Sequence, residues 1–212
     1  MSHGAHRRLA AAAHAADWND PVWHVVHRMG TVALARQKPG SLSYASTGVG
    51  SAAHLAGELF NSRAGVDTTH IPYKGGGPAM IDLLGGRITS YYSTPSTAAP
   101  HVESGKLRAL AATGLTRSPM LPNVPTVAES GYPGFEATNW YAFVAPGKMP
   151  VDLLERWNRE LAKVLKSPDV REQLLQHGLE PMPGTREDLA RYIRKENEVW
   201  GKLIRAAKIT AE

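Results

Sequence analysis

Residues 42–61 read LSYASTGVGSAAHLAGELFN, a segment that carries strand, turn and helix signals one after another. Residues 42–46 lie between the turn signals KPGS (38–41) and a glycine-containing segment, 47–51, and are typical of a short strand. From residue 52 onward, Leu55, Leu59 and Phe60 recur at helical spacing. The stretch therefore predicts a strand, a glycine-rich loop and a helix in succession.

The same order recurs twice further along the chain. A strand at 69–73 precedes the loop KGGG (74–77) and a helix at 78–84, which would begin with Pro78 at the favoured first position. A third unit has a strand at 87–92, a loop at 93–96 and a helix to about residue 104, and further strands are predicted at 107–113 and 140–145. Alternating strands and helices predict an α/β fold, with a parallel or mixed sheet covered on both faces.

The chain divides into three segments that differ in composition and in the pattern of apolar residues. Residues 1–30 are atypical, 31–145 carry the α/β pattern, and 146–212 carry amphipathic helices. We expect these helices at 151–167, from residue 169, and after a capping-box-like start at Thr185–Asp188. Trp157 and Trp200 lie on their apolar faces and are predicted to be core residues.

Composition excludes several classes of function. The 212 residues include 24 Lys+Arg, 19 Asp+Glu and no Cys, which excludes disulfides, thiolate metal sites and cysteine nucleophiles. The basic residues are scattered, which does not favour nucleic-acid binding, and no apolar run is long enough to span a membrane. Five of the nine histidines lie in residues 1–30, but without ligand spacing backed by carboxylates. We predict neither a metal nor a cofactor.

The three loops have the composition of anion sites. In a parallel sheet, ligands bind beyond the carboxyl ends of the strands, where backbone N–H groups and helix N-termini meet. One partly buried helix end contributes about 2 kcal/mol, whereas micromolar affinity needs about 8 kcal/mol. A carboxylate or phosphate would thus need several converging loops. The alternative is that the glycines only form tight turns.

Other interpretations of these residues are weaker. The pattern Gly48-x-Gly50-x-x-Ala53 matches a dinucleotide fingerprint, but the next strand ends in Tyr73 and Lys74 where an acid is required. No P-loop or G-x-S-x-G elbow is present. Lys74 could be a carboxylate partner or a solvated loop lysine. The residues favour binding without catalysis; the alternative is a small α/β enzyme that uses the Gly48–Ser51 loop as an oxyanion or phosphate site.

Several stretches of the chain resemble a known family. They include KPGSLSYASTGVGSAAHLAGELF (38–60), HIPYKGGGPAMIDLLGGRI (70–88) and LPNVPTVAESGYPGF (121–135). These stretches resemble the periplasmic substrate-binding proteins of tripartite tricarboxylate transporters, the Bug-type receptors, over about residues 31–212. The resemblance implies a type II periplasmic-binding-protein-like, Venus-flytrap fold. Residues 31–145 would form one lobe with a mixed sheet, and the helices after Pro146 would belong to an incomplete second lobe.

The resemblance also implies a function. Such receptors bind a small carboxylic acid, without catalysis or cofactor, and deliver it to a membrane permease. The family's third loop often carries Asp where this chain has Ser93, a difference that could alter selectivity. The ligand-binding positions that the resemblance implies are Ser46, Thr47, Gly48, Gly50, Ser51, Tyr73, Lys74, Gly75, Ser93 and Thr94.

The start of the chain departs from the family. Residues 1–30 do not resemble the front of the first lobe, so we expect a truncated form that leaves apolar helix faces uncovered and self-associates through them. The resemblance implies a periplasmic location. The apolar run Leu9–Ala13 is shorter than a working export signal, however, so a cytoplasmic location stays open.

Overall fold

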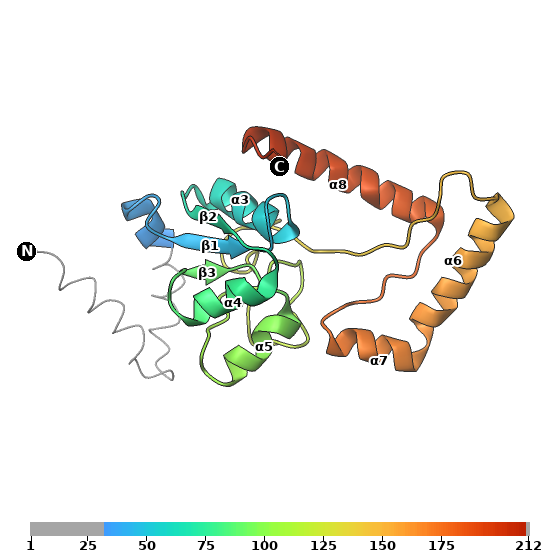
Figure 1. Cartoon of the computed structure of the whole chain (residues 1–212), viewed down its shortest axis with the longest axis horizontal. Coiled ribbons are helices and arrows are strands. Elements are labelled where there is room, and N and C mark those ends of the chain that lie inside the picture. The colour runs from blue at the N-terminus through green and yellow to red at the C-terminus, as the bar shows by residue number, and fades with distance from the viewer. Residues whose placement is uncertain (1–31, 211–212) are drawn as a thin grey trace, which may run out of the picture.

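The computed structural model describes residues 32–210 (Figure 1). The expected segment 1–30, its histidine cluster and its signal-like run therefore lie outside the described residues. The first described element is a helix over residues 32–37, which ends at the turn before the first strand.

Three β-loop-α units follow one another, as the sequence predicts. The sheet has the order β2-β1-β3, and both of its strand pairs are parallel. The expected mixed sheet is not seen in residues 32–210. A helix follows each strand and returns the chain to the edge where that strand began, so the next strand runs parallel to it. The elements are β1 (Ser43–Ser46), α3 (Ala52–Ala64), β2 (Thr69–Pro72), α4 (Gly76–Leu84), β3 (Ser90–Tyr91) and α5 (Pro95–Glu103).

Helices cover both faces of this small sheet. Successive residues of the central strand β1 face opposite sides. Tyr44 lies against α3, where a Cβ placed on Gly57 would be 2.2 Å from the tyrosine ring. Ala45 packs on the other side with Ala79 of α4 and Ile88. The two faces position α3 and α4 so that both helices begin at the same edge of the sheet.

A second cluster joins α3 to the chain that follows the sheet. Phe135 is 1% exposed and packs with Ala56 and Val127. Trp200 packs against the cluster, as predicted, and its indole Nε1 donates to Glu196 at 2.8 Å. This cluster connects α3 with residues 127–137 and with the last helix, α8 (Arg186–Ala206).

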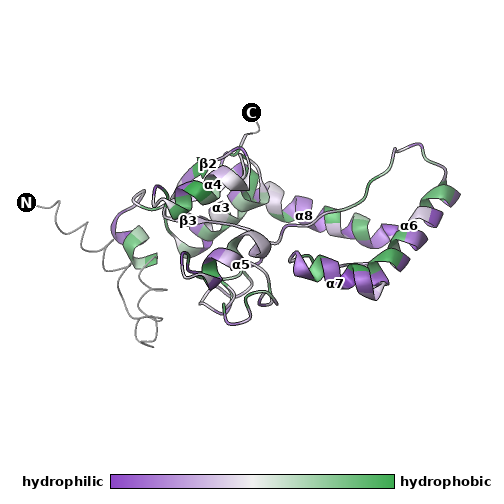
Figure 2. Cartoon of the chain, turned by 60° about the horizontal axis from the view of Figure 1, so that its bottom comes forward, coloured by the Kyte–Doolittle hydropathy of each residue, from purple (hydrophilic) through white to green (hydrophobic). Residues whose placement is uncertain are grey.

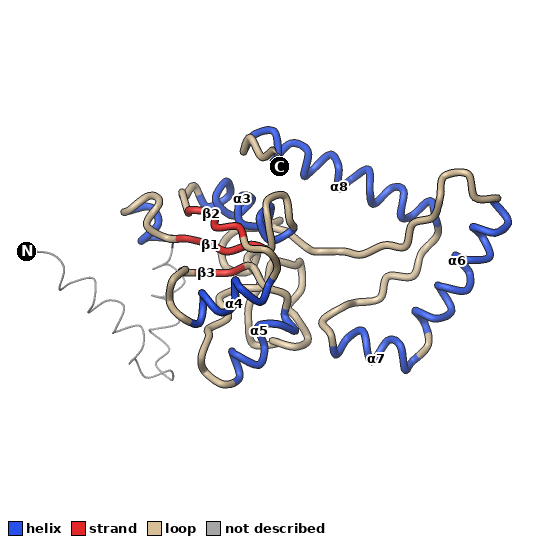
Figure 3. The backbone as a smooth tube through the Cα atoms, viewed as in Figure 1, coloured by secondary structure: helices blue, strands red, loops and turns tan. Residues whose placement is uncertain are grey.

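Residues 104–150 contain neither helices nor extended strands (Figure 3). The strands predicted at 107–113 and 140–145 are wrong. Ala112 forms only an isolated parallel bridge with Thr126, and residues 139–145 form no backbone hydrogen bond with any described residue. A strand needs a neighbour for its backbone groups. The predicted strand at 87–92 also shortens, to Ser90–Tyr91.

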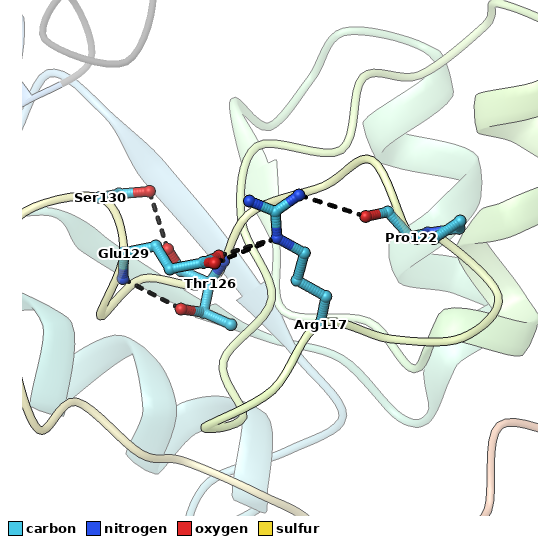
Figure 4. Close-up of polar contacts among 5 residues, drawn as sticks. All are labelled: Arg117, Pro122, Thr126, Glu129 and Ser130. Atoms are coloured by element: carbon cyan, nitrogen blue, oxygen red, sulfur yellow. Dashed lines mark hydrogen bonds and ion pairs between the residues drawn. The ribbon is translucent and has the colours of Figure 1, made fainter.

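Polar contacts hold part of this irregular segment in place (Figure 4). The N–H of Thr126 donates to the carboxylate of Glu129 at 2.7 Å, and the N–H of Glu129 donates back to the threonine hydroxyl at 3.0 Å. Arg117 donates to the same carboxylate at 3.0 Å, and Ser130 donates to the carbonyl of Thr126 at 2.8 Å. Arg117 and these hydrogen bonds lower the pKa of Glu129. The contacts fix the loop that presents Val127 and Phe135 to the core.

The C-terminal helices extend away from the sheet. Helices α6 (Val151–Lys166) and α7 (Pro168–Gln176) project as an arm, and α8 returns to contact α3 (Figure 1). Polar and apolar residues alternate around α6 (Figure 2), yet none of its residues is buried. Trp157 is 56% exposed, so its predicted core position is wrong.

No helix in residues 32–210 has the length and apolar character of a membrane span.

Candidate functional site

The three predicted loops lie at one edge of the sheet. Residues 47–51, 73–75 and 92–94 follow β1, β2 and β3, whose carboxyl ends point the same way because the strands are parallel. A Cβ placed on Gly48 would lie 3.8 Å from the carbonyl oxygen of Tyr73. A Cβ placed on Gly76 would lie 3.0 Å from the hydroxyl of Tyr91. The first loop thus adjoins the second, and the second adjoins the end of β3.

The first loop is folded around the carbonyl of Gly48. This oxygen accepts from the hydroxyls of Ser46 at 2.9 Å and Ser51 at 2.7 Å. Ser51 is also the N-cap of α3, and its side chain accepts from the N–H of His54. Ser46 is fully buried and supports the loop from below, while Thr47 and Gly50 are exposed at its tip. The sequence-predicted residues of this loop are therefore together, in two different environments.

Two stacked histidines lie beneath the first loop. The ring centroids of His54 and His70 are 3.7 Å apart with the planes inclined by 6°. His54 Nδ1 accepts from the N–H of Gly50 at 3.0 Å, and His70 Nε2 lies 2.7 Å from the Ser46 hydroxyl oxygen. The ring of Tyr44 stacks on His70, and its hydroxyl donates to Glu58 at 2.6 Å. The loop thus rests on an aromatic base contributed by β1, β2 and α3.

Burial keeps both imidazoles neutral at neutral pH. Burial, followed by the charge of the neighbouring His54, lowers the pKa of His70 to about 4. Burial also lowers the pKa of His54, although the carboxylate of Glu58 opposes this shift. Burial and the bond to Glu58 raise the pKa of Tyr44. In the free protein, the two rings beneath the first loop therefore add no imidazolium charge at neutral pH.

The lowered pKa of His70 predicts acid sensitivity. Its pKa is 6.5 in the unfolded chain and about 4 in the folded one, so the unfolded state binds more protons between these values. The stabilisation is complete above pH 6.5 and is lost as the pH falls to about 4. We expect the urea midpoint of unfolding to fall as the pH is lowered from 6.5 to 4, and to fall less in His70→Gln. Exposed His177→Gln is the control and should behave as the unmodified chain does. If the midpoint of His70→Gln fell with pH as steeply as that of the unmodified chain, the result would contradict the lowered pKa of His70.

The second loop has one exposed cation and a glycine in a left-handed conformation. Gly75 is the N-cap of α4 with φ of 99°, and α4 begins at Gly76, so Pro78 occupies its third position and not the predicted first one. Lys74 is exposed and forms no hydrogen bond or ion pair with the described residues. Tyr73 donates its hydroxyl to Asp82 at 2.9 Å, which directs its side chain toward α4. Only its backbone faces the first loop.

The third loop presents hydroxyls at the start of α5. Thr94 is the N-cap of this helix, and Pro95 is its first residue. The hydroxyl oxygens of Thr94 and Thr97 are 2.9 Å apart, and the hydroxyl of Ser93 donates to the carbonyl of Thr94 at 3.2 Å. A Cβ placed on Gly178 would lie 3.7 Å from the amide nitrogen of Ser96. The segment after α7 therefore lies against this loop.

Three residues near the site were not predicted from the sequence. His70 supports the first loop, Tyr91 lies beside the second, and Asp82 binds both the Tyr73 hydroxyl and Arg87. Arg87, followed by Tyr73, lowers the pKa of Asp82. The contacts of His70 and Tyr91 depend on strand register, in which Tyr44 pairs with His70 and Ala45 pairs with Tyr91. No sequence motif encodes this register, so the sequence gives no signal for either residue beyond its polar side chain.

Other candidate sites carry less chemistry. No group of three or more His, Cys, Asp or Glu side chains within residues 32–210 could hold a metal ion. A shallow depression lies between the loop at 119–120 and α7, and it contains none of the ten predicted site residues. Its lining is Pro119, Met120, Pro168, Arg171, Glu172, Leu175 and Gln176.

Comparison with known proteins identifies the family. A sequence model described as "Tripartite tricarboxylate transporter family receptor" matches residues 24–209. The chain belongs to this receptor family. It is 41% identical over 178 residues to the "UPF0065 protein in tcbD-tcbE intergenic region" of Pseudomonas sp. strain P51, covering 84% of this chain and 53% of that protein. It is 37% identical over 174 residues to "Protein BugT" of Bordetella pertussis, covering 82% and 53%.

Solved structures share the fold of this chain. Rpa4515 from R. palustris, solved with adipate, has a TM-score of 0.75 and 34% identity, covering 86% of this chain and 61% of that one. MatC from Rhodopseudomonas palustris, solved with bound malate, has a TM-score of 0.67 and 27% identity, covering 83% and 61%. The resemblance in fold class is confirmed. The chain spans about half the length of the two curated relatives above.

Proposed function

We propose that this chain binds a small carboxylic acid, without catalysis, as part of a solute receptor of a tripartite transporter. The observation that carries the proposal is the meeting of three loops at the carboxyl edge of three adjacent parallel strands. Helices α3, α4 and α5 begin at these loops, so their N–H ends favour an anion there. The proposed ligand-binding residues are Ser46, Thr47, Gly48, Gly50, Ser51, Tyr73, Lys74, Gly75, Ser93 and Thr94.

The relatives support a dicarboxylate as the ligand class. Two structural neighbours were solved with adipate and with malate, and both molecules are dicarboxylates. In this chain, one carboxylate would bind at the first loop, and Lys74 would reach it from the second. We further propose that residues 31–145 form the ligand-binding lobe and that 146–212 belong to the other lobe.

The enzyme alternative has weaker support. Ser46 and His70 have the separation of a nucleophile and a base, at 2.7 Å. Ser46 is fully buried, however, and its hydroxyl donates to the carbonyl of Gly48. No described carboxylate is hydrogen-bonded to His70 to orient it. The pair supports the loop, and the family is one of receptors.

Removal of the charge on Lys74 tests the proposed site. We expect Lys74→Gln to weaken binding of adipate or malate about tenfold, because one charge-assisted contact contributes about 1.5 kcal/mol. Calorimetric titration of the full chain measures this. Exposed Lys106→Gln, three residues after the end of α5, is the control for net charge. Equal affinity in both variants would remove Lys74 from the site, and no binding by the unmodified chain would contradict the proposed function.

We also infer that the chain acts in the periplasm and hands its ligand to a membrane permease. The family is described as a transporter receptor, and the neighbour BugD is described as a periplasmic binding protein. Osmotic shock of the source cells should then release the protein with periplasmic markers. Its retention with cytoplasmic markers would contradict this location.

The exposed face of α6 supports self-association. Trp157 and Val164 are 56% and 51% exposed on one helical stripe with the half-buried Leu161. We expect two copies to cover this face mutually, because apolar area removed from water contributes about 25 cal/mol per Å². Light scattering after size exclusion should give a dimer whose population falls in Trp157→Glu and not in Arg156→Glu. A monomer at all concentrations would contradict the proposal.

A further inference from the structure

We propose that His54 is a proton-coupled gate on the first loop: its neutral ring holds the N–H of Gly50, and carboxylate binding takes over this N–H as the ring gains a proton. The inference rests on the proposed function, because it concerns the same carboxylate site. His54 lies in the first turn of α3, three positions after the N-cap Ser51.

The first loop has already used its glycine N–H groups. Gly48 donates to the Ser46 hydroxyl at 3.1 Å, and Gly50 donates to His54 Nδ1 at 3.0 Å. The N–H of Ser51 donates to the carbonyl of Gly48 at 3.2 Å. An anion that binds a glycine N–H of this loop must therefore displace an internal acceptor. Nδ1 of His54 is the acceptor that a proton can convert to a donor.

Protonation changes the loop in the direction that an anion needs. A protonated His54 cannot accept from Gly50, so the N–H of this exposed glycine becomes available at the loop tip. The same proton adds a positive charge beneath the loop. A bound carboxylate in turn stabilises that charge, so binding and proton uptake are thermodynamically linked.

The groups around His54 favour one added proton on the pair of stacked histidines and disfavour a second. Glu58, on the same helix, favours the charged ring, and it accepts a hydrogen bond from Tyr44 of β1. His70 of β2 stacks on His54 at 3.7 Å, so two charged rings would repel each other. Tyr92, after β3, packs edge-on against Tyr44 and is the remaining titratable group of this cluster. The stacked pair is expected to take up a single shared proton.

Calorimetry of the full chain with adipate tests the linkage directly. Titrations at pH 6 to 8, in buffers that differ in ionisation enthalpy, measure the protons taken up on binding. We expect uptake approaching one proton per adipate, and an affinity that rises by about tenfold for each unit of pH between pH 8 and pH 6, as linkage requires. Binding with no proton uptake and no pH dependence would overturn the gate and leave the proposed function intact. No binding of adipate or malate at any pH would overturn both.

Two variants separate the gate from a structural role. His54→Asn keeps an acceptor near the Nδ1 position but cannot be protonated, so we expect weak binding with no proton uptake. His54→Leu removes the acceptor and frees the N–H of Gly50, so we expect pH-independent binding that is tighter than that of His54→Asn. Exposed His177→Gln should retain the unmodified profile. Should either variant fail to fold, the buffer dependence of the unmodified chain still decides the proposal.

Discussion

Replacing Phe135 by Ala is expected to lower the free energy of unfolding by about 3–5 kcal/mol, which is typical of buried aromatic truncations. Phe135 is 1% exposed and lies at the centre of the cluster that joins α3 to residues 127–137. Its ring meets Phe60 edge-on, with the centroids 6.4 Å apart. The truncation would open a cavity between α3 and residues 127–137.

This loss is large compared with the stability of an ordinary domain, about 5–15 kcal/mol. Urea denaturation followed by circular dichroism should show a much lower midpoint, or a chain largely unfolded without urea. Phe143→Ala is the matched control, because Phe143 is 74% exposed in the irregular segment; its effect should stay within about 0.5 kcal/mol. Equal midpoints for the two variants would contradict the position of the core.

Gly57→Ala is expected to destabilise the chain, although Ala is favoured over Gly in a helix by about 1 kcal/mol. The added methyl would lie 2.2 Å from Cε2 and 2.5 Å from Cζ of Tyr44, whose side chain is 1% exposed. The tyrosine cannot move without breaking its bond to Glu58 and its stacking on His70. Overpacking of this kind costs about 1–3 kcal/mol.

Gly201→Ala provides the matched helical control. A methyl at Gly201 of α8 would meet only the guanidinium end of Arg205, at 3.3 Å, and this flexible group can move. We expect Gly201→Ala to be neutral or stabilising in the same urea experiment. A stabilising effect of Gly57→Ala as well would contradict the close packing of α3 on Tyr44.

The repeated loop-and-helix pattern predicted much of the α/β region. Glycines, capping residues and apolar spacing gave the order of β1, α3, β2, α4, β3 and α5, because these signals are local. The strands expected at 107–113 and 140–145 failed because a strand depends on a distant neighbour. Trp157 failed in a related way: an apolar helix face predicts burial, but not whether a partner covers it.

The sequence predicted the loops of the site but not the histidine side chains that pack beneath the first loop. Parallel strands bring Gly48, Gly75 and Thr94 to one edge of the sheet, so their proximity follows from the fold class. The stacking of His54 on His70 depends on how α3 crosses β2, and the bond from Gly50 to His54 depends on a ring orientation. Neither has a sequence signature.

Amide NMR decides whether the three loops bind one small carboxylic acid together. Titration of the ¹⁵N-labelled chain with adipate should shift the amide signals of Gly50, Gly75 and Ser96 together, with one common saturation curve. Shifts confined to one loop, or to residues such as Leu175 beside the depression at α7, would contradict the account.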